Sequence, residues 1–232
     1  QGIQSSFTPY VYPGIDTHTT ECKVESCLIT NNGNTNNSTV GIGVYSDGPI
    51  TLKSTRIVNN SGIHGESVAS IGGGAYLVNI SVRCSTIISD CEFVGNSASQ
   101  SGGLNLTGTG RYELKNSTFK SNFRRDNPIT GFVNNVFCDA LPNLDLHRNV
   151  FINDVSPNID CGQNLLIWNC GSVENPATIR NNTISGNLTS LPIDSPGIVI
   201  QGADCFTKVE NTIIQGSSDG LQKTSAQSQV LM

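Results

Sequence analysis

The chain of 232 residues has little charge, few aromatic side chains and no long apolar run. Only 13% of its residues are charged and 6% are aromatic, and it has one methionine and one tryptophan. The net charge of −5, with no basic run beyond Arg124–Arg125, excludes the electrostatic footprint of a nucleic-acid-binding protein. No segment reaches the length of a membrane-spanning helix, so we expect no membrane insertion.

Several motifs that hold metals, phosphates or nucleophiles are also missing. The sequence has no Cys-x-x-Cys pair, no Gly-x-Ser-x-Gly elbow, no phosphate loop and no dinucleotide fingerprint. The run Gly72–Gly74 is better explained by a tight turn between strands than by phosphate binding. We therefore expect no metal and no cofactor.

What the chain does contain is a pattern repeated seven times. Each copy has an aliphatic residue, an aliphatic or aromatic residue five positions later, and a small polar residue three positions after that. The copies begin 28, 36, 26, 32, 33 and 30 residues apart. They are Val24/Ile29/Asn32, Leu52/Ile57/Asn60, Ile88/Phe93/Asn96, Leu114/Phe119/Asn122, Leu146/Phe151/Asp154, Ile179/Ile184/Asn187 and Val209/Ile214/Ser217.

The repeat predicts an all-β, right-handed parallel β-helix of about seven coils, roughly 30 Å long at the spacing of paired strands. One copy is too small to bury an apolar face alone, so the copies must stack and share one core. A third β-rich run recurs after most copies, and the column three residues after the first aliphatic is small or polar. The alternative, an Asn/Gly-rich β-sandwich, would not need three columns in register. The third runs are residues 41–45, 73–78, 102–106, 132–137, 164–168 and 197–200.

The repeat also sets the expected domain organisation. Residues 22–217 form the β-helix, residues 1–21 an extended arm and residues 218–232 a tail. Neither end shows a helix or a charged strand that would shield an open sheet edge. We therefore expect the partner to be a second copy stacked head to tail, or the neighbouring segments of a longer β-helix. The chain begins with Gln, so we expect a secretion signal to have been removed or to lie outside this segment.

Cysteines and glycosylation sequons together predict a secreted or cell-surface protein. Eight cysteines without metal-type spacing suggest four disulfides, with a weak preference for Cys138 with Cys170 because both end third runs of adjacent copies. Asn116 and Asn181 occupy a register expected to face solvent, whereas Asn187 cannot both stack in the core and carry a glycan. The cysteines are Cys22, Cys27, Cys84, Cys91, Cys138, Cys161, Cys170 and Cys205. The sequons begin at Asn36, Asn37, Asn59, Asn79, Asn105, Asn116, Asn181 and Asn187.

Residues 72–106 resemble the repeat of the polymorphic outer membrane protein family. Gly73-Gly74-Ala75 matches the GGA[ILV] motif of that family, and Phe93 to Asn96 matches its FxxN motif. Phe119 to Asn122 gives a second FxxN, whereas Ile replaces Phe at 29, 57, 184 and 214. The resemblance implies a surface-exposed adhesive or structural β-helix, similar in shape to the wider pectin-lyase-like superfamily.

The alternative function is a β-helix that binds or cleaves carbohydrate, as a lyase or a glycoside hydrolase. Such enzymes need acids clustered on one sheet, and this chain has no Asp-Asp pair. No carboxylate repeats in register near His64-Gly65 or Arg180, and the histidines are interpreted as exposed or turn residues. Trp168 is expected to pack on its coil rather than to meet a sugar. The candidate acids are Asp90, Asp145, Asp154, Asp160 and Asp204, and the histidines are His18, His64 and His147.

The sequence therefore predicts a non-enzymatic, extracellular structural or adhesive glycoprotein. We expect its β-helix to stack end to end into a filament or to form part of a larger surface stalk.

Overall fold

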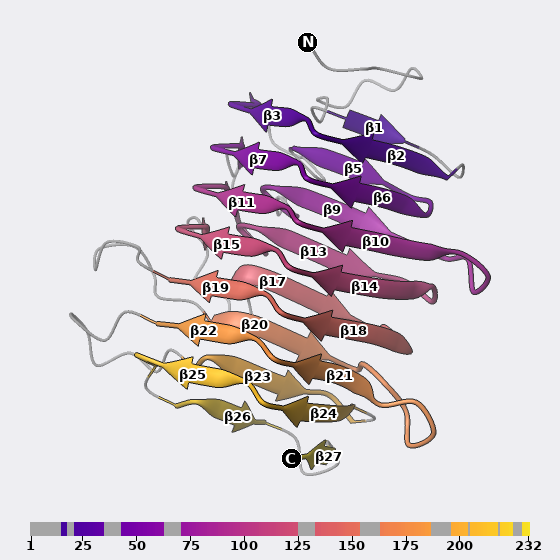
Figure 1. Ribbon diagram of the computed structural model, residues 1–232, viewed down its shortest axis with the longest axis vertical. Coiled ribbons are helices and arrows are strands. Elements are labelled where there is room, and N and C mark those ends of the chain that lie inside the picture. The colour runs from indigo at the N-terminus through magenta and orange to yellow at the C-terminus, as the bar shows by residue number, and fades with distance from the viewer. Residues whose placement is uncertain are drawn as a thin grey trace.

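The computed structural model is a parallel β-helix, in which successive coils lie on one another along a single axis (Figure 1). No helix occurs among the residues described here. The structure describes residues 15–17, 21–34, 43–62, 71–124, 133–153, 163–186, 196–203, 205–217, 219–224 and 229–232.

Each coil contributes one short strand to each of three or four parallel sheets, called A to D. Sheet A contains β1 (Ile15–Thr17), β5 (Val44–Ser46), β9 (Ala75–Val78), β13 (Leu104–Thr107), β17 (Val133–Asp139), β20 (Gln163–Trp168), β23 (Ile198–Gln201) and β26 (Leu221–Lys223). Sheet B contains β2 (Cys22–Glu25), β6 (Ile50–Lys53), β10 (Ser85–Ser89), β14 (Arg111–Lys115), β18 (Asn143–His147), β21 (Ala177–Arg180), β24 (Phe206–Glu210) and β27 (Gln229–Leu231). Sheet C contains β3 (Leu28–Thr30), β7 (Arg56–Val58), β11 (Glu92–Val94), β15 (Thr118–Lys120), β19 (Val150–Ile152), β22 (Thr183–Ser185) and β25 (Ile213–Gln215). Sheet D contains β4 (Gly33–Asn34), β8 (Ser61–Gly62), β12 (Ser97–Ala98) and β16 (Phe123–Arg124).

The predicted fold class is confirmed, but the expected number of about seven coils is not, because the structure supports about five full turns. The described strands number eight, eight, seven and four in sheets A to D, so the coils are not equivalent. The bounds predicted for the β-helix were also too narrow. Strand β1 of the expected arm pairs with β5, and β26 and β27 of the expected tail pair with β23 and β24. Eight strands at about 4.8 Å spacing give a length of about 38 Å.

The interior is a set of apolar columns that run along the axis. Alternate side chains of each strand point inward, and parallel register places equivalent residues of successive coils next to one another. Phe93 stacks on Phe119 with ring centroids 4.7 Å apart, and Phe119 stacks on Phe151 at 5.2 Å. Leu52, Ile88, Leu114, Leu146 and Ile179 form a second column and are fully buried. The paired columns of the sequence repeat are therefore the core.

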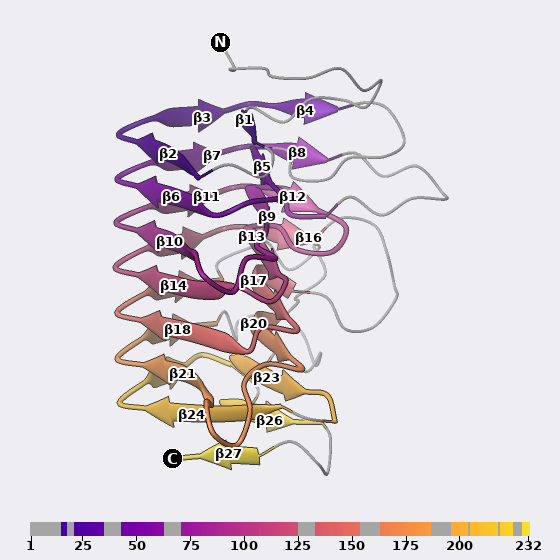
Figure 2. The same cartoon turned by 90° about the vertical axis from the view of Figure 1, so that its right-hand side faces the viewer.

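Sharp bends join sheet B to sheet C, at the left edge of the molecule in Figure 2. One residue of each bend has positive φ, between 45° and 57°, and the next residue points inward. Asn and Asp tolerate this backbone region better than most residues, and they hold four of the seven positions. The seven are Ser26, Ser54, Asp90, Asn116, Arg148, Asn181 and Asn211.

Polar ladders fill the inward positions at the bends. At the bend from C to D, Asn60 donates from its side chain to Oδ1 of Asn96 at 2.9 Å, and Asn96 donates to Oδ1 of Asn122 at 2.9 Å. Asn96 also donates to the carbonyl of Ile57 at 2.8 Å, so its buried amide is satisfied. At the bend from B to C, Thr55, Cys91, Ser117, Asn149 and Asn182 are buried, as the sequence predicted. Cys27 is exposed and Thr212 half-buried, because both lie in outer coils.

The Asn ladder leaves sheet D at the coil of β16. Asn122 donates to Asn135 of β17 at 2.9 Å, and Asn135 donates to Asn164 of β20 at 2.6 Å. Strands β17 and β20 have seven and six residues, against four in β13, so the strands of sheet A lengthen after β16, the last described strand of sheet D. The register between β17 and β20 shifts between Val133 and Val136. Hydrogen bonds between Asn side chains therefore continue along the axis at the point where the strands of sheet A become longer.

We predict that Asn96→Ala lowers the free energy of unfolding by about 3 kcal/mol or more, because four hydrogen bonds to this side chain are lost in a buried site. Urea unfolding followed by circular dichroism measures the loss. Glu92→Ala, in the same coil, removes an exposed ion pair with Arg56 and should cost less than about 1 kcal/mol. Equal losses in the two variants would show that the ladder is not a special source of stability.

Candidate functional site

Three neighbouring strands of sheet B carry a cluster of polar and charged side chains on their outer surface. It is called the polar face here and comprises Arg111, Glu113 and Lys115 of β14, Asn143, Asp145 and His147 of β18, and Thr178 and Arg180 of β21. Alternation explains its position, because Tyr112, Leu114, Leu144, Leu146 and Ile179 between these residues point into the core.

Parallel register arranges the polar face in rows along the axis. Arg111 lies beside Asn143, Glu113 beside Asp145, and Lys115 beside His147. The rows continue into β21, where Thr178 lies beside Asp145 and Arg180 beside His147. Two carboxylates are therefore direct neighbours, flanked by cations on both sides.

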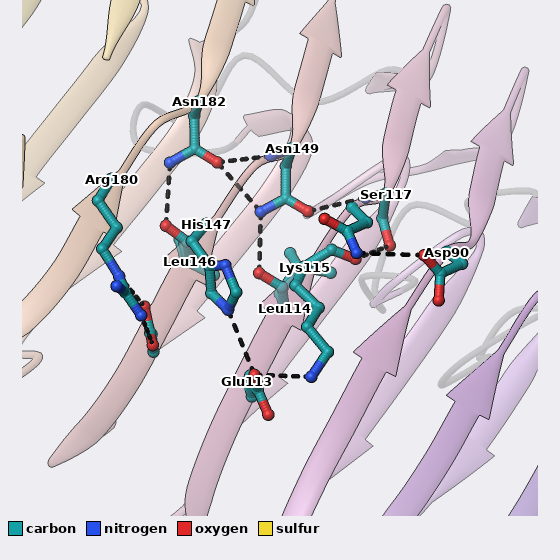
Figure 3. Close-up of polar contacts among 12 residues, drawn as sticks. Asp90, Glu113, Leu114, Lys115, Ser117, Leu146, His147, Asn149, Arg180 and Asn182 are labelled. Carbon is teal, nitrogen blue, oxygen red and sulfur yellow. Dashed lines mark hydrogen bonds and ion pairs between the residues drawn. The ribbon is translucent and has the colours of Figure 1, made fainter. Parts of the chain in front are cut away.

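Glu113 is neutralised within the polar face (Figure 3). Its Oε1 accepts from Nζ of Lys115 at 2.9 Å and lies 3.2 Å from Nε2 of His147. Hydrogen bonding from Lys115 is the main reason that the pKa of Glu113 lies below its ordinary value, and His147 adds to it. The side chain of His147 is only 13% exposed. The interpretation of His147 as an exposed or turn histidine is therefore wrong.

Asp145 is held by a two-point ion pair. Nη2 of Arg180 donates to its Oδ2 at 2.8 Å and Nε donates to its Oδ1 at 3.3 Å. The hydrogen bonds from Arg180 to this carboxylate raise the pKa of Arg180. The expectation that no carboxylate repeats in register near Arg180 is wrong, because Glu113 and Asp145 are register neighbours and Asp145 is the ion-pair partner of Arg180.

A shallow hollow opens at the start of these strands, with a volume of about 320 Å³. One wall is the turn before β21, in which Ser172 N–H donates to the Asn175 carbonyl at 2.9 Å and Asn175 N–H donates to Ser172 Oγ at 3.1 Å. Nδ2 of Asn175 donates to the Pro142 carbonyl at 3.0 Å and also to Oδ1 of Asn143. The lining consists of Arg111, Tyr112, Asn143, Leu144, Asp145, Asn175, Pro176 and Thr178.

The described sequons fall into two groups. Asn59, Asn116 and Asn181 are exposed, as the register argument predicted for the last two. Asn79 is fully buried, donates to the Cys84 carbonyl at 3.1 Å and accepts from Ser81 N–H, and Asn105 is 2% exposed. Glycan acceptance at Asn79 or Asn105 is therefore contradicted, because a buried amide cannot carry a sugar. Asn36, Asn37 and Asn187 lie outside the described residues.

The described cysteines are free thiols, so the prediction of four disulfides is wrong for these seven residues. Four of them, Cys91, Cys138, Cys170 and Cys205, are buried and act as small apolar side chains. Cys170 and Cys138 are neighbours, as expected, but Sγ of Cys170 contacts the carbonyl of Cys138 at 3.5 Å rather than its sulfur. Burial raises the pKa of Cys91 to about 11, which makes a poor nucleophile at neutral pH. Cys161 lies outside the described residues.

Of the remaining candidates, the structure describes Trp168 and Asp90. Trp168 packs edge-on against Phe137, with centroids 6.1 Å apart, in a small outer cluster with Leu166 and Val199. The expected packing of Trp168 on its coil is confirmed. Asp90 lies at a bend, where its Oδ1 accepts from Nδ2 of Asn116 at 3.2 Å. His18, His64, Asp154, Asp160 and Asp204 lie outside the described residues.

The ends of the helix differ from its middle. Inward residues of the central coils are fully buried, whereas Val209, Ile214, Leu221 and Val230 of the last coils are only half-buried. The edge strands β25, β26 and β27 have one hydrogen-bonded neighbour each among the described strands, and so do β1, β2 and β3 at the other end.

Comparisons with protein families, curated proteins and solved structures gave no match for this chain. Within the described ranges, no helix is long and apolar enough to cross a membrane, and no three His, Cys, Asp or Glu side chains group as metal ligands.

We predict that Glu113 stabilises the fold in a pH-dependent way. Because its folded pKa is lowered, the stabilisation is fully present above its ordinary pKa of 4.5 and is lost as the pH falls through the lower folded value. Glu113→Gln should lower the free energy of unfolding by about 0.5–1 kcal/mol at neutral pH, since the ion pair is partly exposed. Urea unfolding of both proteins at pH 7 and about pH 3 should show this difference disappearing in acid. A difference that is unchanged across this range would contradict the ion-pair role.

Proposed function

We propose that this chain is an extracellular structural or adhesive glycoprotein, whose β-helix stacks end to end into a filament or forms part of a larger surface stalk. The observation that carries the proposal is the contrast between the sealed middle of the helix and its half-buried last coils. Phe119, Leu114 and Leu146 are fully buried, but Ile214 and Val230 at the last coils are not. Covering apolar surface of this kind with another coil is favourable, because it removes the surface from water.

Open edges of parallel sheets are complementary to each other. The edge strands at the amino-terminal end, β1, β2 and β3, belong to the same three parallel sheets as β26, β27 and β25 at the other end. All strands within a sheet run in one direction, so the last coil of one copy can continue the sheets of the next. Such a contact is heterologous and does not close on itself, so it generates a filament.

Two partners fit the same edges. A second copy of this chain would give a head-to-tail homopolymer, and further coils of a longer chain would extend the same helix. Both satisfy the unpaired backbone groups and cover the half-buried side chains. The partner is therefore expected to be a coil of a parallel β-helix whose strands can continue the same sheets.

The repeat motifs support a relationship to the polymorphic outer membrane protein repeat, and more broadly to pectin-lyase-like β-helices. A Cβ on Gly73 would lie 2.6 Å from the carbonyl oxygens of Gly102 and Ser97, so this position needs glycine. Phe93 and Asn96 supply the aromatic stack and the Asn ladder. Gly73, Phe93 and Asn96 thus each have a packing or hydrogen-bonding reason in this chain.

The proposal assigns no catalytic step to the polar face. A hydrolase with adjacent carboxylates needs one of them as an acid with a raised pKa. Here the pKa of Glu113 is lowered instead, and Asp145 is held in an ion pair with Arg180. This charge pattern favours binding or structural support over glycoside cleavage.

We predict that the wild-type protein forms linear particles as its concentration rises, and that Val230→Asp suppresses them. The substitution places a charge at the half-buried end of the core, where covering it would cost several kcal/mol, so association should weaken about tenfold or more. Sedimentation velocity and electron microscopy measure both effects. A continuous filament should show an axial repeat near 38 Å, as estimated from strand spacing.

The matched control is Val82→Asp, because Val82 is 76% exposed on the flank before β10. It should assemble like the wild type, and circular dichroism should show both variants folded. A wild-type protein that stays monomeric at every concentration would overturn the assembly proposal. An equal loss in the control would show that any added charge prevents association.

We further predict glycan attachment at Asn59, Asn116 and Asn181, and none at Asn79 or Asn105, when the chain is secreted from a eukaryotic cell. The first three side chains are exposed, and the other two are buried. Glycopeptide mass spectrometry with enzymatic deglycosylation measures the occupancy of each site. Glycan at Asn79 would mean that the coil of β9 and β10 is open when the sugar is added, and an unmodified chain would contradict the glycoprotein proposal.

A further inference from the structure

Two loops project from one long edge of the β-helix, where sheet A turns into sheet B (Figures 1 and 2). The loop between β9 and β10 covers residues 79–84, and the loop between β20 and β21 covers residues 169–176. The connections between them on this edge are short and cover residues 108–110 and 140–142. The two loops belong to interior coils, so they take no part in the contact between edge strands that end-to-end stacking needs.

Both loops expose apolar side chains. Ile80 and Val82 are 70% and 76% exposed in the first loop, and Val173 is 68% exposed in the second. All other exposed large hydrophobic side chains among the described residues lie in the first or last strands of their sheets or at the end of the chain. The flank of the helix therefore carries apolar surface that stacking of the ends would leave in water.

Hydrogen bonds hold these side chains outward. The side chain of Asn79 bridges the first loop internally, and Oγ1 of Thr109 in the next coil donates to the carbonyl of Ile80 at 3.0 Å. The second loop is closed by the pair of hydrogen bonds between Ser172 and Asn175. A partner would meet surfaces that are already fixed, which lowers the entropy cost of association.

The two loops carry opposite charges. Arg83 is exposed beside Val82 in the first loop, and Glu174 is exposed beside Val173 in the second. Neither charge takes part in an ion pair among the described residues. Each loop thus combines exposed apolar surface with one available charge, and the two surfaces are complementary in sign.

The spacing of the loops suits a two-fold contact. In sheet A, β9 pairs with β13, β13 with β17 and β17 with β20, so the loops lie three coil steps apart, or about 14 Å. A two-fold axis perpendicular to the helix axis and midway between the loops would place the first loop of each copy against the second loop of the other. Two copies running in the same direction would instead bring Arg83 to Arg83 and Glu174 to Glu174.

We propose that two copies of this chain pair side by side and antiparallel through these loops. Ile80 and Val82 of each copy lie against Val173 of the partner subunit, and Arg83 lies against Glu174 of the partner subunit. This inference goes beyond end-to-end stacking, because it joins copies across the helix axis. It gives the exposed apolar residues of the flank a partner of defined chemistry.

The test is sedimentation equilibrium of Val230→Asp, whose end is blocked, so side-by-side pairing is measured whether or not the wild type forms filaments. We expect a monomer–dimer equilibrium in roughly the micromolar range, because the interface is small. Adding Arg83→Glu should weaken the dimer at least about tenfold, since like charges then face each other at both loop contacts. Adding Glu174→Arg to that variant should restore the dimer to within about threefold, because the ion pairs are rebuilt with reversed signs.

The matched control is Arg148→Glu, which makes the same charge change at an exposed bend between sheets B and C. It should dimerise like the parent protein. In the otherwise wild-type chain, Val82→Asp should reduce only the side-by-side pairing, because linear particles form through the edge strands. A parent that stays monomeric at every concentration, a dimer unchanged by Arg83→Glu, no recovery in the charge-swapped variant, or an equal loss in Arg148→Glu would overturn the proposal. Circular dichroism confirms that each variant is folded.

Discussion

Hydrogen bonding between successive coils is the constraint on which the rest of the structure depends. Each backbone amide of a strand pairs with the coil above or below, so a coil cannot shift by one residue without breaking the ladders on both sides. This register stacks Phe93 on Phe119 in the core and brings Asn60 to Asn96 at the bend. The same register places Glu113 next to Asp145 on the outer surface. Core, ladder and polar face are therefore three results of one alignment.

The sequence predicted the parts of the fold that repeat. The columns led by Leu114 and Phe119 identified sheets B and C, and the third runs identified most of sheet A. Sheet D could not be predicted, because two-residue strands such as Ser61–Gly62 have no apolar alternation. The outermost strands β1 and β27 were missed for a similar reason, since they pair through backbone groups without the full pattern.

The polar face could have been found from the same repeat. Glu113 and Asp145 each precede the first aliphatic residue of a copy, and Lys115, His147 and Arg180 each follow one. The candidate acids were chosen among the Asp residues alone, so the alignment of Glu113 with Asp145 was missed. The contact between Asn143 and Asn175 gave no such signal, because Asn175 lies in a turn whose length differs from coil to coil. Disulfides were inferred from an even cysteine count, although buried free thiols pack equally well in apolar columns.

The unequal sealing of the coils affects how the molecule would carry load. Hydrogen bonds between coils run along the axis, so tension along that axis acts on the interfaces in series and the weakest one separates first. The coils from β4 to β16 are joined through four described sheets and enclose fully buried side chains, whereas Ile214 and Val230 of the last coils are only half-buried. Under tension the coils at the carboxy-terminal end should therefore separate first.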